Sequence, residues 1–274
     1  MRHTVFKLVI LSFFCLCKTD LSSQSSYYPR DNRLYHHLER LQYLTDSDFN
    51  IHLGSKNLKR NEIFDAFRKT DSLSIHPKDL NLISYYLQEG TYKAHAEKLG
   101  FWKTFFYNPS HLIEHRSKDF GITINPILNF NLGQDLENDE FIFENTRGVE
   151  IYGQWDDKFY FYTALTENQA KPLSYIDPFI DRYFAIPGQG NYKDYQSKLI
   201  DGFNGFDFSN ARAYLGYQMS RHTNLELGHN KHFLGNGIRS LLLSDSGHNY
   251  FYLKFHLKIW KLQYQSIFAE LSSI

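Results

Sequence analysis

The chain has 274 residues, and 30 Lys plus Arg balance 30 Asp plus Glu, so its formal net charge is zero. That balance argues against a nucleic-acid-binding protein, which usually carries a basic surplus. Mean hydropathy is −0.48. No apolar run of about 18 residues occurs beyond the N-terminus, which excludes a helical membrane protein. Twenty Tyr and 24 Phe favour β-strands. An outer-membrane β-barrel stays compatible with these values, because alternating strands keep mean hydropathy low.

Residues 1–24 predict a secretory signal peptide. A basic start is followed by the apolar segment Leu8 to Cys17, which is too short to span a bilayer. Both cysteines, Cys15 and Cys17, lie inside this segment. We therefore expect an exported mature chain without a disulfide and without a thiolate metal site.

Residues 25–117 predict a small helical region. Asp31 can cap a helix that runs to about Tyr43, and Asn61 can cap a second one. Pro77 suits the first turn of a third helix, where its missing N–H costs nothing.

From residue 118 onward the hydrophobic period becomes that of strands. In Phe120–Leu132 the apolar side chains fall on one face, whereas Asn125, Asn129 and Asn131 fall on the other. This alternation is longer than the usual five or six residues of a globular strand and reaches the ~9–11 residues of a membrane strand. The asparagine-rich face suits the lumen of a barrel.

About seven or eight strands are predicted in all. The others are expected at Phe141–Trp155 with a bulge near Arg147 and Gly148, at Lys158–Leu165, at Ala211–Met219, around Leu225 and Leu227, and on both sides of a parity switch at 258–259. Residues 168–207 are predicted to form one long connection.

The stretch Gly228–Gly247 interrupts the strand pattern with closely spaced glycines and a short apolar run. Within it, Phe233-Leu-Gly-Asn-Gly-Ile-Arg-Ser-Leu-Leu-Leu-Ser-Asp245 resembles the F/W-x-G-x-G-x-R-S-L-L-L-S-D/N signature of the Wzi-like capsule assembly family. The resemblance is closest to the Bacteroidetes branch that includes the gliding-motility protein RemB.

That resemblance implies a mainly β fold: an outer-membrane antiparallel β-barrel formed by residues 118–274, preceded by a helical periplasmic region at 25–117. Because members of the family are longer, we expect this chain to supply the N-terminal half of a larger barrel. An eight-stranded barrel is the alternative. The implied partners are surface or capsular polysaccharide and outer-membrane lipid.

Four residues of the stretch Gly228–Gly247 are candidate ligand-binding residues: Lys231, Arg239, Ser240 and Asp245. The charged ones could contact an acidic sugar. Alternatively, the loop folds inward as a constriction and Arg239 pairs with a wall carboxylate such as Glu226. Ser240 lacks the G-x-S-x-G elbow of a nucleophile, so no catalytic residue is predicted.

A histidine cluster invites a metal hypothesis, and its members are His222, His229, His232 and His248. The i, i+3 spacing of His229 and His232 completes no recognised ligand set. We therefore expect structural or solvated histidines, no metal and no cofactor.

The function expected from the resemblance is a non-enzymatic outer-membrane barrel that assembles or attaches surface polysaccharide, with adhesion or gliding as a variant. Two alternatives stay open. A barrel hydrolase acting on glycans or lipids would need a nucleophile and base, and a passive porin-like channel would need only the polar lumen.

Overall fold

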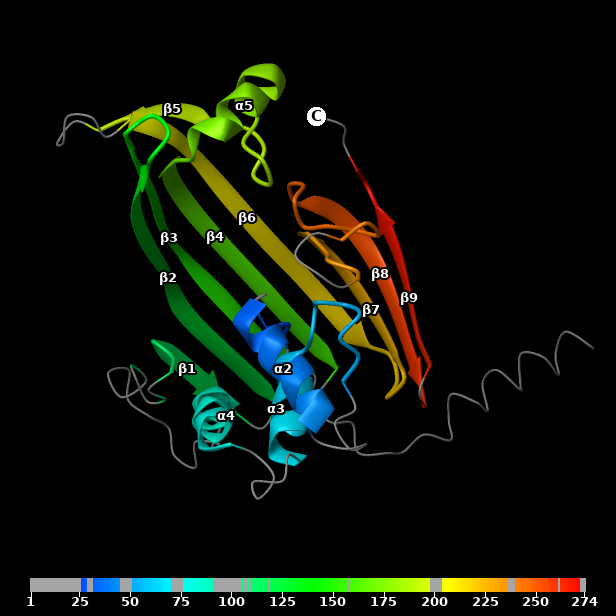
Figure 1. Cartoon of the computed structure of the whole chain (residues 1–274). Helices are drawn as coiled ribbons and strands as arrows, with labels where there is room; N and C mark the ends of the chain where they lie inside the picture. Colours follow the sequence, from blue (N-terminus) through cyan, green and yellow to red (C-terminus); the bar gives the residue numbers. More distant parts are fainter. Residues whose placement is uncertain are drawn as a thin grey trace, which may run out of the picture.

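In the computed structural model, one curved antiparallel sheet carries a small helical segment on its concave side (Figure 1). The structure describes residues 26–28, 32–44, 51–69, 76–90, 105, 108, 110–117, 119–156, 158–197, 204–235, 240–260 and 262–271. The predicted signal peptide at 1–24 lies outside these ranges. Within them, no helix is long and apolar enough to cross a bilayer.

The helical segment consists of α2 (Asn32–Leu44), α3 (Arg60–Lys69) and α4 (Pro77–Gly90). All three predicted helices are confirmed, and α4 begins at the proline that suggested it. Leu34, Leu38 and Leu41 of α2 are buried in a core that α3 and α4 share. Tyr43, at the predicted end of this helix, is 90% exposed.

The sheet has nine strands among the described residues, so the prediction of a mainly β fold is confirmed. The strands are β1 (Ile113–Arg116), β2 (Phe120–Asp135), β3 (Glu140–Trp155), β4 (Phe159–Lys171), β5 (Lys193–Gln196), β6 (Asn204–Gln218), β7 (Thr223–Asn230), β8 (Tyr250–Ile259) and β9 (Leu262–Ala269). They pair in the order β1-β2-β3-β4-β6-β7-β8-β9, with β5 added to β6. Over the described ranges the sheet is open.

Strand boundaries correct three predictions. First, β1 lies inside the region assigned to helices. Second, the connection after β4 is shorter than predicted, because β4 extends to Lys171 and β6 already begins at Asn204. It contains a 3-10 turn (Ser174–Ile176), the helix α5 (Asp177–Tyr183) and β5.

The third correction concerns the predicted bulge near Arg147 and Gly148. The register between β3 and both neighbours is continuous, so that prediction is wrong. A Cβ atom at Gly148 would lie 2.2 Å from the carbonyl oxygen of Leu165. The glycine therefore permits a close approach of β4 rather than an extra residue.

The two faces of the sheet have opposite chemistry. The convex face exposes large apolar side chains, including Leu128 at 77%, Leu227 at 61% and Phe251 at 64% exposure. The concave face carries a buried cluster made almost entirely of tyrosines: Tyr152, Tyr160, Tyr162, Tyr214, Tyr250 and Tyr252, with Ala164. A soluble sheet shows the reverse arrangement, with its apolar side chains inward.

Packing on the concave face predicts that Gly216→Ala destabilises the protein. A Cβ atom there would lie 1.9 Å from the ring of Tyr160, which is fully buried and has little room to shift. We expect a loss of about 1–3 kcal/mol in the free energy of unfolding, measured by urea denaturation. Gly247→Ala, with no atom within 4 Å of the added carbon, is the matched control. Equal effects of the two substitutions would contradict this packing argument.

Candidate functional site

A single row of residues across four strands organises the concave face. The register aligns Tyr160 of β4 with Gly216 of β6, Gly216 with Glu226 of β7, and Glu226 with Lys254 of β8. Residues aligned in this way point to the same face of a sheet. Because Gly216 has no side chain, the ring of Tyr160 reaches across β6 to the carboxylate of Glu226.

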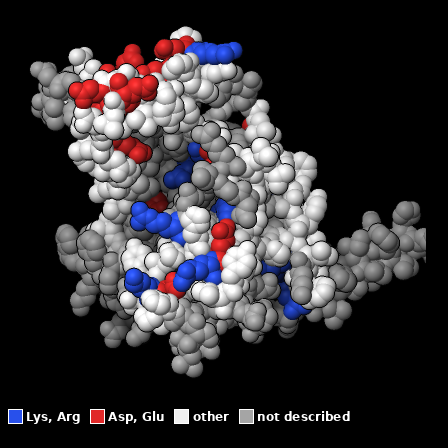
Figure 2. All heavy atoms as spheres, viewed as in Figure 1, with Lys and Arg blue, Asp and Glu red and all other residues white. Residues whose placement is uncertain are grey.

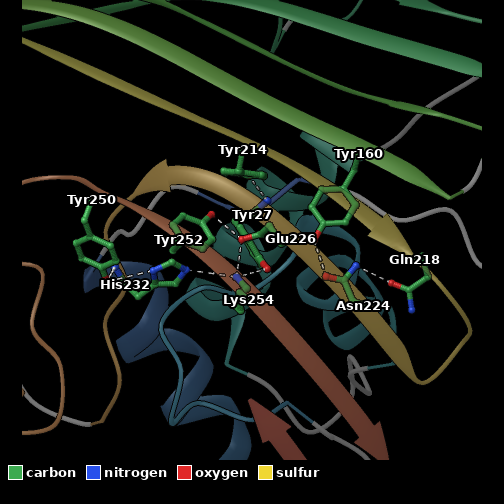
Figure 3. A network of polar contacts seen from close by, with 10 residues as sticks. All are labelled: Tyr27, Tyr160, Tyr214, Gln218, Asn224, Glu226, His232, Tyr250, Tyr252 and Lys254. Atoms are coloured by element: carbon green, nitrogen blue, oxygen red, sulfur yellow. Dashed lines mark hydrogen bonds and ion pairs between the residues drawn. The ribbon is translucent and has the colours of Figure 1, made fainter. Parts of the chain in front are cut away.

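Glu226 and Lys254 form a buried ion pair at the centre of this row (Figure 3). Their nitrogen and oxygen atoms are 2.6 Å apart, and the side chains are 0% and 3% exposed. The hydroxyls of Tyr160 and Tyr252 each donate to a different oxygen of Glu226 at 2.7 Å. Both carboxylate oxygens are thereby satisfied, which a buried charge requires.

Tyr27 joins the chain ahead of the helices to this pair. Its backbone N–H donates to the hydroxyl of Tyr214 at 2.8 Å, and its own hydroxyl accepts from the Lys254 ammonium at 2.6 Å. Burial, followed by the charge of Glu226, raises the pKa of Tyr27 well above its usual value. The phenol is therefore neutral and can donate as well as accept.

Two cations at the start of α3 lie over tyrosine rings of the sheet. The Lys59 ammonium is 4.6 Å from the centre of the Tyr160 ring, and the Arg60 guanidinium is 4.1 Å from that of Tyr152. Such cation–π contacts strengthen when they are desolvated. Burial lowers the pKa of Lys59 to about 8. These contacts hold the helical segment against the concave face.

His232 extends the network toward the loop between β7 and β8. Its Nδ1 lies 3.2 Å from the Tyr250 hydroxyl, and its Nε2 lies 3.5 Å from the Lys254 ammonium. Burial first, and then the charge of Lys254, lower the pKa of His232 to about 3. The imidazole is therefore neutral, with Nε2 assigned as the acceptor that faces the ammonium.

The predicted loop residues are only partly brought together. Lys231 and Asp245 line one cavity of about 110 Å³, together with Tyr27. The Lys231 ammonium also donates to the carbonyl oxygen of Gly188 at 2.6 Å. Ser240 points elsewhere and donates to the carbonyl oxygen of Leu234. Arg239 lies outside the described residues.

The described part of this loop contacts the chain between α2 and α3. The Lys56 N–H donates to the Phe233 carbonyl at 3.1 Å, and the Gly235 N–H donates to the Gly54 carbonyl at 2.8 Å. Glu226, the wall carboxylate suggested as a partner for Arg239, forms an ion pair with Lys254.

Sequence reasoning missed Tyr27 and Lys254, and it named Glu226 only as a wall carboxylate for Arg239. One signal was available, since Glu226 lies between the outward-facing Leu225 and Leu227, and Lys254 follows Leu253 in the same way. Parity therefore placed both charges on the inner face. It did not show that they face each other, because that depends on the register.

The comparisons with known proteins add no identification. No family model, no curated protein and no solved structure matches this chain.

Removing one member of the central ion pair should cost far more than removing both. Lys254→Met leaves an uncompensated buried carboxylate, so we expect a loss of about 3–5 kcal/mol in the free energy of unfolding. The double variant Glu226→Leu with Lys254→Met should lose less than either single variant. Urea denaturation of the four proteins in the cycle measures the coupling. Additive losses would show that the pair does not act as a unit.

Acidification should destabilise the protein partly through His232. Its pKa is about 3 in the folded chain, against about 6.5 when unfolded. The unfolded state therefore binds more protons between these values, and stability falls as pH falls through this window. From pH 7.5 to pH 5 this contributes about 2 kcal/mol. His232→Gln should lack this part of the pH dependence of unfolding, whereas identical pH dependences would contradict the assignment.

Proposed function

We propose that this chain forms part of an outer-membrane β-barrel that holds or helps assemble surface polysaccharide and catalyses no reaction. The observation that carries the proposal is the reversed chemistry of the two sheet faces. The convex face is apolar and exposed, whereas the concave face is lined by hydroxyl, amide and charged groups.

The convex surface is too apolar for contact with water alone. Its exposed side chains come from nearly every long strand: Leu128, Phe130, Leu132, Val149, Leu165, Leu215, Leu227, Phe251, Leu253 and Phe268. Soluble monomers rarely expose contiguous apolar patches above a few hundred Å². Lipid covers such a face, and antiparallel strands with apolar residues outward are the pattern of outer-membrane barrels.

A bilayer would also require partners for the edges of the sheet. Unpaired backbone N–H and C=O groups cost several kcal/mol each in the hydrocarbon region. The proposal therefore includes further strands that pair beside β2 and β9 and close the barrel. The resemblance of the loop at Phe233–Asp245 to the Wzi-like signature supports the same architecture.

Connection lengths support one orientation of this barrel. At one end the turns are short, as between β8 and β9, where Ile259 pairs directly with Leu262. At the other end lie the α5 connection and the loop between β7 and β8 (Figure 1). Outer-membrane barrels place short turns in the periplasm and long loops outside. We therefore propose that the short-turn end is periplasmic.

The hydrogen bonds of Ser240, the loop hydroxyl considered above as a nucleophile, favour binding over hydrolysis. Ser240 donates to the Leu234 carbonyl and accepts from the Leu242 N–H. Neither partner is a base that could activate it. The amide side chains of the concave face that reach solvent, such as those of Gln263 and Gln265, are suitable partners for sugar hydroxyls. Adhesion or gliding would be a consequence of the same polysaccharide binding.

The membrane part of the proposal is tested by Leu165→Arg, at the middle of β4 on the convex face. A charge on the lipid face near the bilayer midplane costs about 2–4 kcal/mol, so the variant should lose heat-modifiable gel mobility and outer-membrane recovery. Leu241→Arg introduces the same charge at a loop side chain that is fully exposed and serves as the control. A wild-type protein that fractionates as a soluble periplasmic species would refute the barrel.

The polysaccharide part is tested in the same cells. Deleting the gene should shift surface polysaccharide from the cell pellet to the medium, and the wild-type gene should restore retention. If polysaccharide stays on cells that lack the protein, attachment is not its function, whatever the outcome of the fractionation.

A further inference from the structure

A second cleft lies between the helical segment and the short-turn end of β6–β9. It lies on the opposite side of Tyr27 from the cavity that Lys231 and Asp245 line. Its helical side is formed by His52, Ser55, Asn57, Lys59 and Glu62, and its sheet side by Gln218, Arg221, His222, Asn224, Lys254, His256, Lys258, Gln263 and Gln265. No predicted ligand-binding residue belongs to it.

The floor of this cleft is one polar row of the sheet. The register aligns Gln218 with Asn224, Asn224 with His256, and His256 with Gln265. This row lies next to that of Glu226 and Lys254, on the side nearer the turns. The Asn224 amide donates to the Gln218 side-chain oxygen at 3.0 Å, which leaves its second amide hydrogen for another acceptor.

Positive charge dominates the cleft. Its lining includes Lys59, Arg221, Lys254 and Lys258, whereas Glu62 is the acidic residue among the described lining residues. Glu226 neutralises Lys254 from behind the floor. Lys258 reaches Glu62 only at 4.0 Å, with a third of its side chain exposed. Burial lowers the pKa of Lys59 to about 8, although the charges of Glu62 and Glu226 act in the opposite direction.

Two further contacts orient the side chain of Arg221 through His222. Nδ1 of His222 lies 2.8 Å from the Lys258 carbonyl oxygen, so this nitrogen carries the proton and donates. Nε2 of His222 then accepts from Nε of Arg221 at 2.8 Å. This arrangement fixes the guanidinium at the turn between β6 and β7 and keeps its two terminal nitrogens available for an oxyanion.

Basic side chains also gather over the concave face as a whole, whereas acidic ones gather at the end of the sheet that carries α5 (Figure 2). An anionic ligand is therefore attracted toward the part of the concave face that carries the helical segment and repelled from the end that carries α5.

We infer that this cleft binds a saccharide unit that carries an oxyanion, with Arg221 and Lys258 as contacts for the anion. The Gln265 amide and the second amide hydrogen of Asn224 are contacts for ring hydroxyls. The inference rests on the proposed polysaccharide function and specifies the charge class of the ligand. It also places the contact on the short-turn side of the protein, away from the loop between β7 and β8.

The test is direct binding to the purified full chain in detergent. The probes are a galacturonic acid trisaccharide, the neutral maltotriose and inorganic phosphate, measured by calorimetry. We expect the acidic trisaccharide to bind at least tenfold more tightly than maltotriose. Arg221→Gln and Lys258→Gln should each weaken that binding about tenfold, which corresponds to one charged hydrogen bond. Maltotriose binding should stay unchanged.

Lys193→Gln removes a charge from exposed β5 at the opposite end and is the matched control, and melting temperatures verify that all variants fold. Equal affinity for both trisaccharides, unaffected by the two variants, would overturn the inference but leave the polysaccharide function intact. Phosphate binding as tight as that of the acidic trisaccharide would overturn the assignment of a saccharide. Binding of neither trisaccharide would contradict the proposed function itself.

Discussion

The arrangement of the whole molecule depends on one ion pair placed on the concave face of the sheet. Glu226 and Lys254 are directly opposite each other on β7 and β8 and almost completely buried. A buried pair is tolerable only where hydrogen bonds replace the lost water. One replacement comes from β8 itself, through Tyr252. The others come from distant parts of the chain, through Tyr160 of β4 and Tyr27 ahead of the helices. Satisfying this pair therefore requires the strands and the N-terminal segment to assemble together.

Tyrosine packs the concave face because the buried ion pair needs hydrogen-bond partners as well as filled space. A leucine core could not satisfy a buried carboxylate, whereas a tyrosine ring fills similar space and presents a hydroxyl at its far end. Long rings need room, and the sheet supplies it with glycines. Tyr160 lies over Gly216, and the Tyr252 hydroxyl would be 2.9 Å from a Cβ atom at Gly228. Alternating glycine and tyrosine across strands thus builds a core that is both packed and polar.

The sequence predicted the element types well because they depend on local patterns. Alternation in Phe120–Leu132 and the proline at the start of α4 are both visible without tertiary information. The errors occurred where a local signal had two meanings. Gly148 looked like a bulge but permits close strand contact. The start of β6 looked like part of a loop, but its Phe206 and Phe208 pack against the α5 connection. Lys231 and Asp245, suggested by the stretch Gly228–Gly247, line the same cavity. The Tyr27 contacts span 187 and 227 residues, a separation that no local pattern encodes.

Tyr27 also determines how the interior is divided. It lines both the cavity beside the loop between β7 and β8 and the basic cleft at the short-turn end. Its backbone is held by Tyr214 and its side chain by Lys254. The residues on either side of Tyr27 form backbone hydrogen bonds with the helical segment. The Tyr28 N–H donates to the Leu58 carbonyl, and the Arg60 N–H donates to the Ser26 carbonyl. Ser26–Tyr28 is therefore a strap between helices and sheet that separates the two spaces. Loss of this strap would weaken the Glu226–Lys254 pair, because the Tyr27 hydroxyl accepts one of the hydrogen bonds of the buried ammonium.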